Sequence, residues 1–286
     1  MLNGWRVVVV LPAYNAAETL ERTISEIDRT VVDEIVLVDD ASTDDTTFVA
    51  RRLGLTCITH ERNLGYGANQ KTCYAAALDA GADIVVMVHP DYQYSPRLVT
   101  AMAAMITSGH YDLVLGSRVL AQNSVANGMP RYKYVANRVL TAIENVALHH
   151  KLSEYHTGLR AFSADLLRSL PLERNSDDFV FDNQVIVQAV ACGARIGEVS
   201  CPTRYERDSS SISFRRSVRY GVGVLAAGAS YVLDRAHIHR APFLDSEGKP
   251  PFVAPSRPAE HPDRIDLVAA GGGVAGVPGV PFPGAG

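Results

Sequence analysis

The chain has 286 residues, of which 47% are apolar and 20% charged, an ordinary composition for a globular protein that buries a sizeable core. The net charge of −4 and the isoelectric point near 6.1 argue against wholesale nucleic-acid binding, because proteins that follow a phosphate backbone normally carry a basic surplus. Four widely spaced cysteines form no CxxC pair, and we expect free thiols in a reducing compartment: Cys57, Cys73, Cys192 and Cys201.

The start of the chain leads from Met1 directly into a strand-like segment, without the basic, apolar and small-residue regions of a signal peptide. No stretch reaches the roughly 18 apolar residues that a membrane-spanning helix requires. These features predict a cytoplasmic protein.

Short apolar segments rich in Val and Ile recur at a steady interval. They lack polar alternation, as expected of strands covered on both faces, and they lie at residues 6–11, 34–38, 56–59, 83–88 and 112–116. Helix-like segments separate them, at 16–30, 43–53 and 66–80. This alternation predicts an α/β fold, a Rossmann-like α/β/α sandwich with a mostly parallel central sheet.

The pattern loosens after residue 120. Helices are predicted at 131–149, 182–191 and 213–233, and a strand at 195–199. The last part of the chain is rich in Pro, Gly and Ala and has few periodic apolar positions. We therefore expect one domain over residues 1–235 and a disordered tail over 236–286.

Ligands of such sheets bind beyond the carboxyl ends of the strands. The first strand runs into PAYN at 12–15, which has neither the glycines of a dinucleotide-binding loop nor those of a P-loop. The second strand ends in Asp39 and Asp40, which could accept hydrogen bonds from ribose hydroxyls or a base N–H. The following residues, 42–45, could equally cap the next helix.

The fourth strand delivers His89, Asp91 and Gln93 at its end. Alternate positions of an extended segment face the same side, so these three side chains could hold Mg²⁺ or Mn²⁺ against a diphosphate. On its own, a His-x-Asp sequence is more often a turn than a metal site.

Several motifs occur together in a fixed order: PAYN at 12–15, VDDASTD at 38–44, NLG at 63–65, HxD at 89–91, GSR at 116–118 and HTGLRAF at 156–162. In order and spacing the set resembles the family 2 glycosyltransferases, over roughly residues 5 to 235. Within that family it is most similar to the branch of dolichyl-phosphate mannose synthase and bacterial polyprenyl-phosphate sugar transferases.

The resemblance implies a GT-A fold and an inverting transfer of a sugar from a nucleotide-diphosphate donor. The acceptor would be a polyprenyl phosphate or a cell-envelope saccharide, and the cofactor a divalent metal, Mg²⁺ or Mn²⁺. By resemblance, the residues that hold the nucleotide are Pro12, Tyr14, Glu18, Asp39 and Asp40. The metal-side positions match Asp91 and Gln93, with His89 replacing the usual first Asp. The arginines that receive phosphate groups match Arg118, Arg131 and Arg160.

The acceptor decides whether a general base is needed. A sugar hydroxyl must lose a proton during attack, whereas a lipid phosphate is already ionised. Asp182 is the candidate base or acceptor-orienting group, and Asp178 is second. The alternative is that Asp177 or Asp178 caps the helix that follows, with Asp182 in its first turn.

A basic cluster precedes an apolar run near the end of the predicted domain. Arg204 and Arg207 come first, and Arg215, Arg216 and Arg219 follow at the start of the helix. Residues 213–233 could therefore contact anionic headgroups at the inner face of a membrane, and ordinary packing on the domain is the alternative.

Two other functions compete with glycosyl transfer. A catalytically silent protein that binds nucleotide sugars is suggested by His89 in the place of an aspartate. A sugar nucleotidyltransferase is disfavoured because its glycine-rich loop is missing after the first strand. A homodimer is one assembly that the chain could form.

Overall fold

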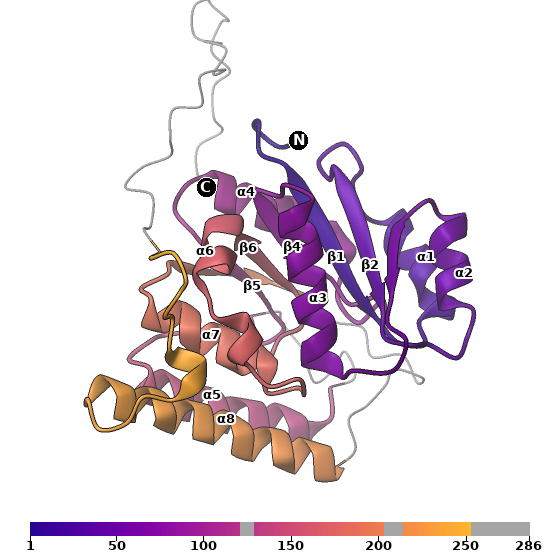
Figure 1. The fold of residues 1–286 in the computed structure, drawn as a ribbon. Helices are drawn as coiled ribbons and strands as arrows, with labels where there is room; N and C mark the ends of the chain where they lie inside the picture. The colour runs from indigo at the N-terminus through magenta and orange to yellow at the C-terminus, as the bar shows by residue number, and fades with distance from the viewer. Residues whose placement is uncertain (121–128, 203–213, 253–286) are drawn as a thin grey trace, which may run out of the picture.

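A computed structural model describes residues 1–120, 129–202 and 214–252, and its core is a seven-stranded sheet with the order β3-β2-β1-β4-β6-β5-β7 (Figure 1). The described strands all run in one direction except β6, which pairs antiparallel with both β4 and β5. The strands are β1 (Val7–Ala13), β2 (Glu34–Asp39), β3 (Thr56–Thr59), β4 (Ile84–Met87), β5 (Leu113–Ser117), β6 (Arg160–Ser163) and β7 (Ile196–Ser200).

Helices cover both faces of the sheet. The helices are α1 (Ala17–Ser25), α2 (Thr46–Arg52), α3 (Tyr66–Asp79), α4 (Val99–Thr107), α5 (Arg131–Ala147), α6 (Ala164–Ser169), α7 (Phe181–Ala191) and α8 (Phe214–Arg235). Alternate side chains of β1 enter two different cores: Val8 and Val10 pack with α3 and α7, whereas Val7 and Val9 pack with α1, α2 and α4. The continuous apolar run of β1 is thus explained by burial on both faces, and the α/β/α sandwich predicted from the sequence is confirmed.

Helices α5 and α8 lie side by side as a pair beneath α7, at one end of the molecule (Figure 1). The buried side of α5 is polar, with Asn137, Thr141 and Glu144 turned inward. None of the helices in the described part of the chain is both long and apolar enough to cross a bilayer.

The fold continues past the expected domain boundary at residue 235. Residues 241–252 were expected to belong to the tail, but Phe243 and Leu244 are buried in the core that contains α7. Gln188 of α7 donates a hydrogen bond to the Phe243 carbonyl at 2.6 Å, and Arg174 pairs with Asp245. Apolar burial, a hydrogen bond and an ion pair together hold this segment on the domain. The remaining tail, 253–286, lies outside the described residues.

Three of the strands and α-helices were not predicted. Strand β6 was not recognised within the HTGLRAF motif, α4 was not recognised between the fourth and fifth strands, and α6 was not recognised directly after β6. All four cysteines lie in the described part and are free thiols, as expected.

Candidate active site

The ends of β1, β2 and β4 meet at one edge of the sheet, as predicted for parallel strands. In the register of the sheet Ala13 of β1 lies beside Asp39 of β2, and Val10 of β1 lies beside Met87 of β4. The residues that follow these strands therefore share one edge. Ser117 at the end of β5 and Arg160 at the start of β6 lie at the same edge, because β6 runs in the opposite direction.

The loops after β1 and β2 are joined by reciprocal hydrogen bonds. The Asn15 amide donates to Ser42 Oγ at 2.8 Å, and the Thr43 amide donates to Asn15 Oδ1 at 2.9 Å. The Asp44 carboxylate accepts from the amides of Thr46, in α2, and Ala17, in α1, at 3.0 Å each. Asp44 therefore binds the amide of the first residue of each helix, although the N-cap residues are Ala16 and Asp45.

The predicted nucleotide-binding residues have different surroundings at this edge. Pro12 is buried at the end of β1, whereas Glu18 is exposed in the first turn of α1. The side chain of Tyr14 is 54% exposed. It follows the strand directly and is available to a planar ligand.

Asp39 and Asp40 are both buried, but within the described part of the chain only Asp40 has hydrogen-bond partners on both of its carboxylate oxygens. Asp40 accepts hydrogen bonds from His60 Nδ1 and the Leu64 amide at 2.8 Å, and from the Gly65 amide at 3.0 Å. Asp39 Oδ2 accepts from the Ser42 amide at 3.1 Å, while Asp39 Oδ1 is buried with no hydrogen-bond partner among the described residues. A buried acceptor without a partner is costly, so Oδ1 of Asp39 still lacks, within the residues that the structure describes, a donor that would offset its burial.

The segment after β4 is a turn, which corrects the expectation of an extended strand end. Tyr92 has a positive φ of 58°, and Asp91 Oδ1 accepts a hydrogen bond from the Gln93 amide at 3.1 Å. His89, Asp91 and Gln93 are half-buried and do not alternate along an extended strand. In the described residues, no three His, Cys, Asp or Glu side chains gather closely enough to hold a metal by themselves.

His89 is held by Tyr66, the first residue of α3. Its Nε2 lies 3.0 Å from the Tyr66 hydroxyl oxygen, and the two rings stack with centroids 5.5 Å apart. The hydroxyl gives its one proton to Asp182 Oδ2 at 2.7 Å, so His89 Nε2 carries the proton of the other hydrogen bond. A protonated ring nitrogen cannot bind a metal, which leaves only Nδ1 of His89 for that purpose.

Asp182 lies at the centre of a polar network. Besides Tyr66, it accepts a hydrogen bond from Gln70 Nε2 at 2.8 Å and pairs with Arg160 Nη1 at 3.3 Å. Burial and the negative charge of Asp182 raise the pKa of Tyr66 well above its ordinary value, so the hydroxyl stays protonated and donates. Asp182 thus has donors on both oxygens.

The loop before Asp182 is pressed onto the start of α3. The Gly67 amide donates to the Asp177 carbonyl at 2.7 Å. A Cβ atom at Gly67 would lie 2.3 Å from the Ser176 carbonyl oxygen, and one at Gly65 would lie 2.7 Å from the Asp177 oxygen. Both positions therefore require glycine because of this close approach.

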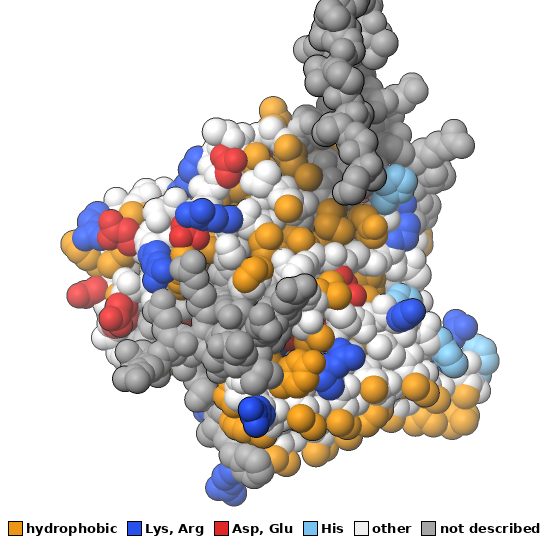
Figure 2. Space-filling view, turned by 180° about the vertical axis from the view of Figure 1, so that it is seen from behind, with side chains coloured by type: hydrophobic (Ala, Val, Ile, Leu, Met, Phe, Trp, Pro, Cys, Tyr) orange, Lys and Arg blue, Asp and Glu red, His pale blue; other side chains and the backbone are white. Residues whose placement is uncertain are grey.

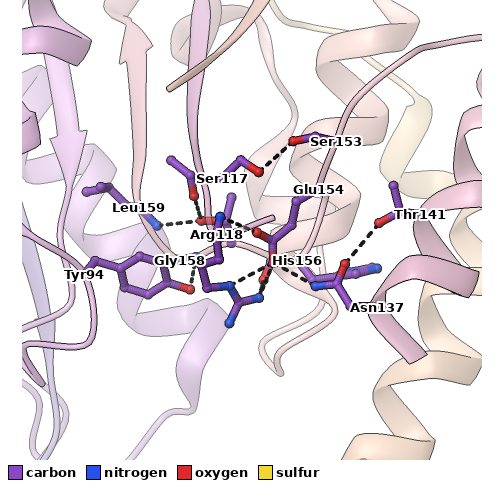
Figure 3. Close-up of polar contacts among 12 residues, drawn as sticks. Tyr94, Ser117, Arg118, Asn137, Thr141, Ser153, Glu154, His156, Gly158 and Leu159 are labelled. Atoms are coloured by element: carbon purple, nitrogen blue, oxygen red, sulfur yellow. Dashed lines mark hydrogen bonds and ion pairs between the residues drawn. The ribbon is translucent and has the colours of Figure 1, made fainter. Parts of the chain in front are cut away.

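Arg118 is bound to an internal carboxylate (Figure 3). Glu154, whose side chain is 0% exposed, accepts from the Arg118 amide at 2.7 Å and from Nε at 2.8 Å. Asn137 of α5 donates to the same carboxylate at 2.7 Å. The predicted phosphate-binding arginine after β5 is thus positioned by a buried acid that the sequence analysis did not single out.

The other two arginines differ in exposure. Arg160 is 0% exposed and donates to the backbone of Asp182 at 2.7 Å and of Thr157 at 2.9 Å, while its Nη2 has no hydrogen-bond partner among the described residues. Burial alone would lower the pKa of Arg160, but the Asp182 carboxylate raises it above its ordinary value. Arg131 is exposed at the first turn of α5. The structure thus brings Arg160 together with Asp182 and leaves Arg131 open to solvent.

Sequence reasoning missed three residues of this network: Tyr66, Gln70 and Glu154. Tyr66 and Gln70 are four positions apart on one face of α3, directly after the NLG motif, and that spacing is a signal that could have found them. Glu154 has no such signal, because its partner Arg118 is 36 positions away.

An open α/β sandwich with acidic residues where β2 and β4 end is the architecture of the GT-A class of glycosyltransferase folds. The sequence pattern of glycosyl transferase family 2 matches residues 8–170, more than half of the chain, and the chain belongs to that family. The protein is a glycosyltransferase.

Three similar proteins illustrate the relationship. The UDP-N-acetylglucosamine–dolichyl-phosphate N-acetylglucosaminyltransferase of Methanococcus voltae is 26% identical over 216 residues, covering 70% of this chain and 86% of the relative. The undecaprenyl-phosphate mannosyltransferase of Micrococcus luteus is 25% identical over 201 residues, covering 68% and 82%. The crystal structure of glucosyl-3-phosphoglycerate synthase from Mycobacterium tuberculosis with UDP has the same fold, with a TM-score of 0.63, 23% identity and coverage of 83% and 82%.

Proposed function

We propose that the protein is an inverting glycosyltransferase that moves a sugar from a nucleoside diphosphate to a polyprenyl phosphate at the cytoplasmic face of a membrane. The observation that carries the donor assignment is the unpartnered, buried Oδ1 of Asp39 at the edge where β1, β2 and β4 end. A ribose hydroxyl or a base N–H would supply the missing donor. Tyr14, with Pro12 and Glu18 beside it, would flank the base, and Asp40 would hold the loop that follows β3.

The diphosphate would lie between the turn after β4 and the start of α5. Asp91 offers one carboxylate, Gln93 an amide oxygen and His89 its Nδ1. This set fits Mg²⁺ or Mn²⁺ held jointly with the diphosphate, since Mg²⁺ is usually bound by one or two carboxylates plus substrate phosphates. The metal would neutralise charge on the departing diphosphate. Arg131 would contact phosphate directly, while Arg118 and Arg160 are each paired with a carboxylate, that of Glu154 and that of Asp182.

The contacts of Asp182 favour a lipid phosphate over a saccharide as the acceptor. Its two oxygens already accept hydrogen bonds from Tyr66 and Gln70 and pair with Arg160. A carboxylate so engaged is suited to orienting an acceptor and poorly placed to take a proton from a sugar hydroxyl. An ionised phosphate needs no general base. The relatives in Methanococcus and Micrococcus have polyprenyl-phosphate acceptors in their names, which supports the same choice.

The experiment is a donor screen with undecaprenyl phosphate or soluble saccharides as acceptors, with Mn²⁺, Mg²⁺ or EDTA present, and mass spectrometry of the products. We expect metal-dependent transfer to the lipid phosphate with inverted anomeric configuration. Asp39→Asn should weaken binding of the nucleoside diphosphate at least about tenfold, or 1.4 kcal/mol. Asp45→Asn, in the same loop but exposed, is the control. Transfer to soluble saccharides alone would exclude the lipid acceptor, and unchanged donor binding by Asp39→Asn would exclude the nucleotide site.

A further inference from the structure

Helices α5 and α8 expose two parallel apolar stripes. The described residues include sixteen exposed large hydrophobic side chains, and ten of them lie on these two helices. They recur at helical spacing, three or four positions apart for the most part: Tyr132, Val135, Val139, Ile143 and Val146 on α5, and Val218, Val222, Leu225, Val232 and Leu233 on α8. We call this surface the α5–α8 face; Figure 2 shows its hydrophobic side chains along the lower edge of the molecule.

The charge around the α5–α8 face is opposite to that of the whole chain. The two helices carry seven basic residues and two acidic ones, whereas the chain has a net charge of −4. Of the two acids, Glu144 is buried and Asp234 lies 3.9 Å from Arg240. Three of the cations, Arg215, Arg216 and Arg219, lie in the first turns of α8, beside the apolar stripe. The surface is thus apolar with a basic border.

The inward sides of the same helices contact the candidate active site. Asn137 of α5 binds Glu154, the partner of Arg118. Tyr220 of α8 lies 2.8 Å from His156 Nδ1, and Gly223 of α8 packs against Val180, two residues before Asp182. The α5–α8 face is therefore the outer surface of the layer that closes the acceptor side.

We propose that the α5–α8 face lies on the surface of an anionic lipid bilayer, with both stripes at the level of the upper acyl chains and the arginines among the headgroups. Amphipathic helices with a basic border bind membranes in this way, through apolar burial together with attraction to anionic lipids. This inference extends the proposed lipid-phosphate acceptor, because it explains how a hydrophobic substrate reaches the site without leaving the bilayer. A second copy of the chain fits less well, since a two-fold contact would bring the two basic borders together.

The test is flotation of the full chain with vesicles of phosphatidylcholine, with or without phosphatidylglycerol. We expect binding to the anionic vesicles that falls steeply at about 1 M salt, where the Debye length is about 3 Å. The double variant Val139→Glu/Val222→Glu places one charge in each stripe and should lower partitioning at least about tenfold. Phe48→Glu, an equally exposed apolar position on α2, is the matched control and should bind like the wild type.

Two results would overturn the proposal. One is failure of the wild-type protein to float with anionic vesicles. The other is a stable dimer in sedimentation analysis without lipid that the double variant converts to a monomer, because the face would then be an interface between copies. Flotation without sugar transfer to lipid phosphate would uphold this surface and reject the proposed acceptor. The opposite result is also possible: neither the wild type nor the double variant floats, but both transfer sugar to undecaprenyl phosphate in detergent. That result would uphold the proposed acceptor and reject the membrane surface.

Discussion

The hydroxyl of Tyr66 donates a 2.7 Å hydrogen bond to Asp182, a residue 116 positions further along the chain. The same oxygen accepts from His89, so one atom of α3 links the turn after β4 to the start of α7. The proposed donor side and acceptor side of the candidate site are thereby held in one fixed geometry.

Removing that oxygen should impair transfer more than folding. For Tyr66→Phe we expect kcat to fall about 10- to 100-fold, because small displacements of His89 and Asp182 disturb alignment of the substrates. The free energy of unfolding should fall by only about 1 to 1.5 kcal/mol. Tyr155→Phe, which removes a buried hydroxyl bonded to Asn145, is the stability control and should keep its activity. Equal losses of activity in both variants would contradict a positioning role for Tyr66.

Asp182 should also be essential for stability. Asp182→Asn would leave the fully buried guanidinium of Arg160 without its counter-charge, and loss of one partner of a buried pair costs about 3–5 kcal/mol. Urea unfolding measures this directly. Asp178→Asn, which affects an exposed pair with Arg219 at 3.8 Å, should cost less than about 1 kcal/mol. A mild effect of Asp182→Asn would show that Arg160 does not depend on this carboxylate.

Gly158 should be intolerant of a methyl group. A Cβ atom there would lie 2.5 Å from His89 Cδ2, so Gly158→Ala must displace the imidazole and should lower kcat about tenfold or more. Gly228 in α8 should tolerate the same substitution, because the Cβ of Gly228→Ala would contact only Ala147 Cβ, at 3.7 Å. That variant should raise the free energy of unfolding by about 0.5–1 kcal/mol and leave transfer unchanged. Thermal unfolding and initial rates of both variants, measured together, check this pair.

The Asp44 carboxylate should make stability depend on pH on the acid side. Burial alone would raise its pKa, but the hydrogen bonds from Thr46 and Ala17 outweigh burial and hold the pKa below its ordinary value. A lowered folded-state pKa stabilises the fold above a pH of about 4, and the contribution is lost as the pH falls through the folded-state pKa. Urea unfolding across this range should show a shallower acid loss for Asp44→Asn than for the wild type. Parallel curves would contradict the prediction.

The parallel part of the sheet was predictable because its signal is local. Strands covered on both faces are continuous apolar runs, so the third strand was predicted at its observed bounds, Thr56–Thr59, and the other predicted strands within two residues. Strand β6 has four residues and starts with Arg160, whose charge is acceptable there only because Asp182 comes to neutralise it. No local pattern reveals that partner.

The candidate site likewise has features that the local sequence predicts and features that depend on contacts in the folded chain. That the residues after β1, β2 and β4 share an edge followed from strand direction alone. Strand direction does not reveal which carboxylates accept hydrogen bonds from the protein. Asp40 accepts from the amides of Leu64 and Gly65, whereas one oxygen of its neighbour Asp39 has no partner among the described residues. The burial of Arg118 against Glu154 likewise depends on contacts that only the folded chain creates.

The glycines at the start of α3 also connect the loop after β3 with the segment that leads into Asp182. Asp40 holds the amide of Gly65, and Gly65 and Gly67 touch the backbone of residues 176–177 with no side chain between them. The two backbones are in direct contact, so no flexible side chain lies between them that could adjust when one backbone moves. A shift of the loop after β3 would therefore be passed directly to the segment that leads into Asp182.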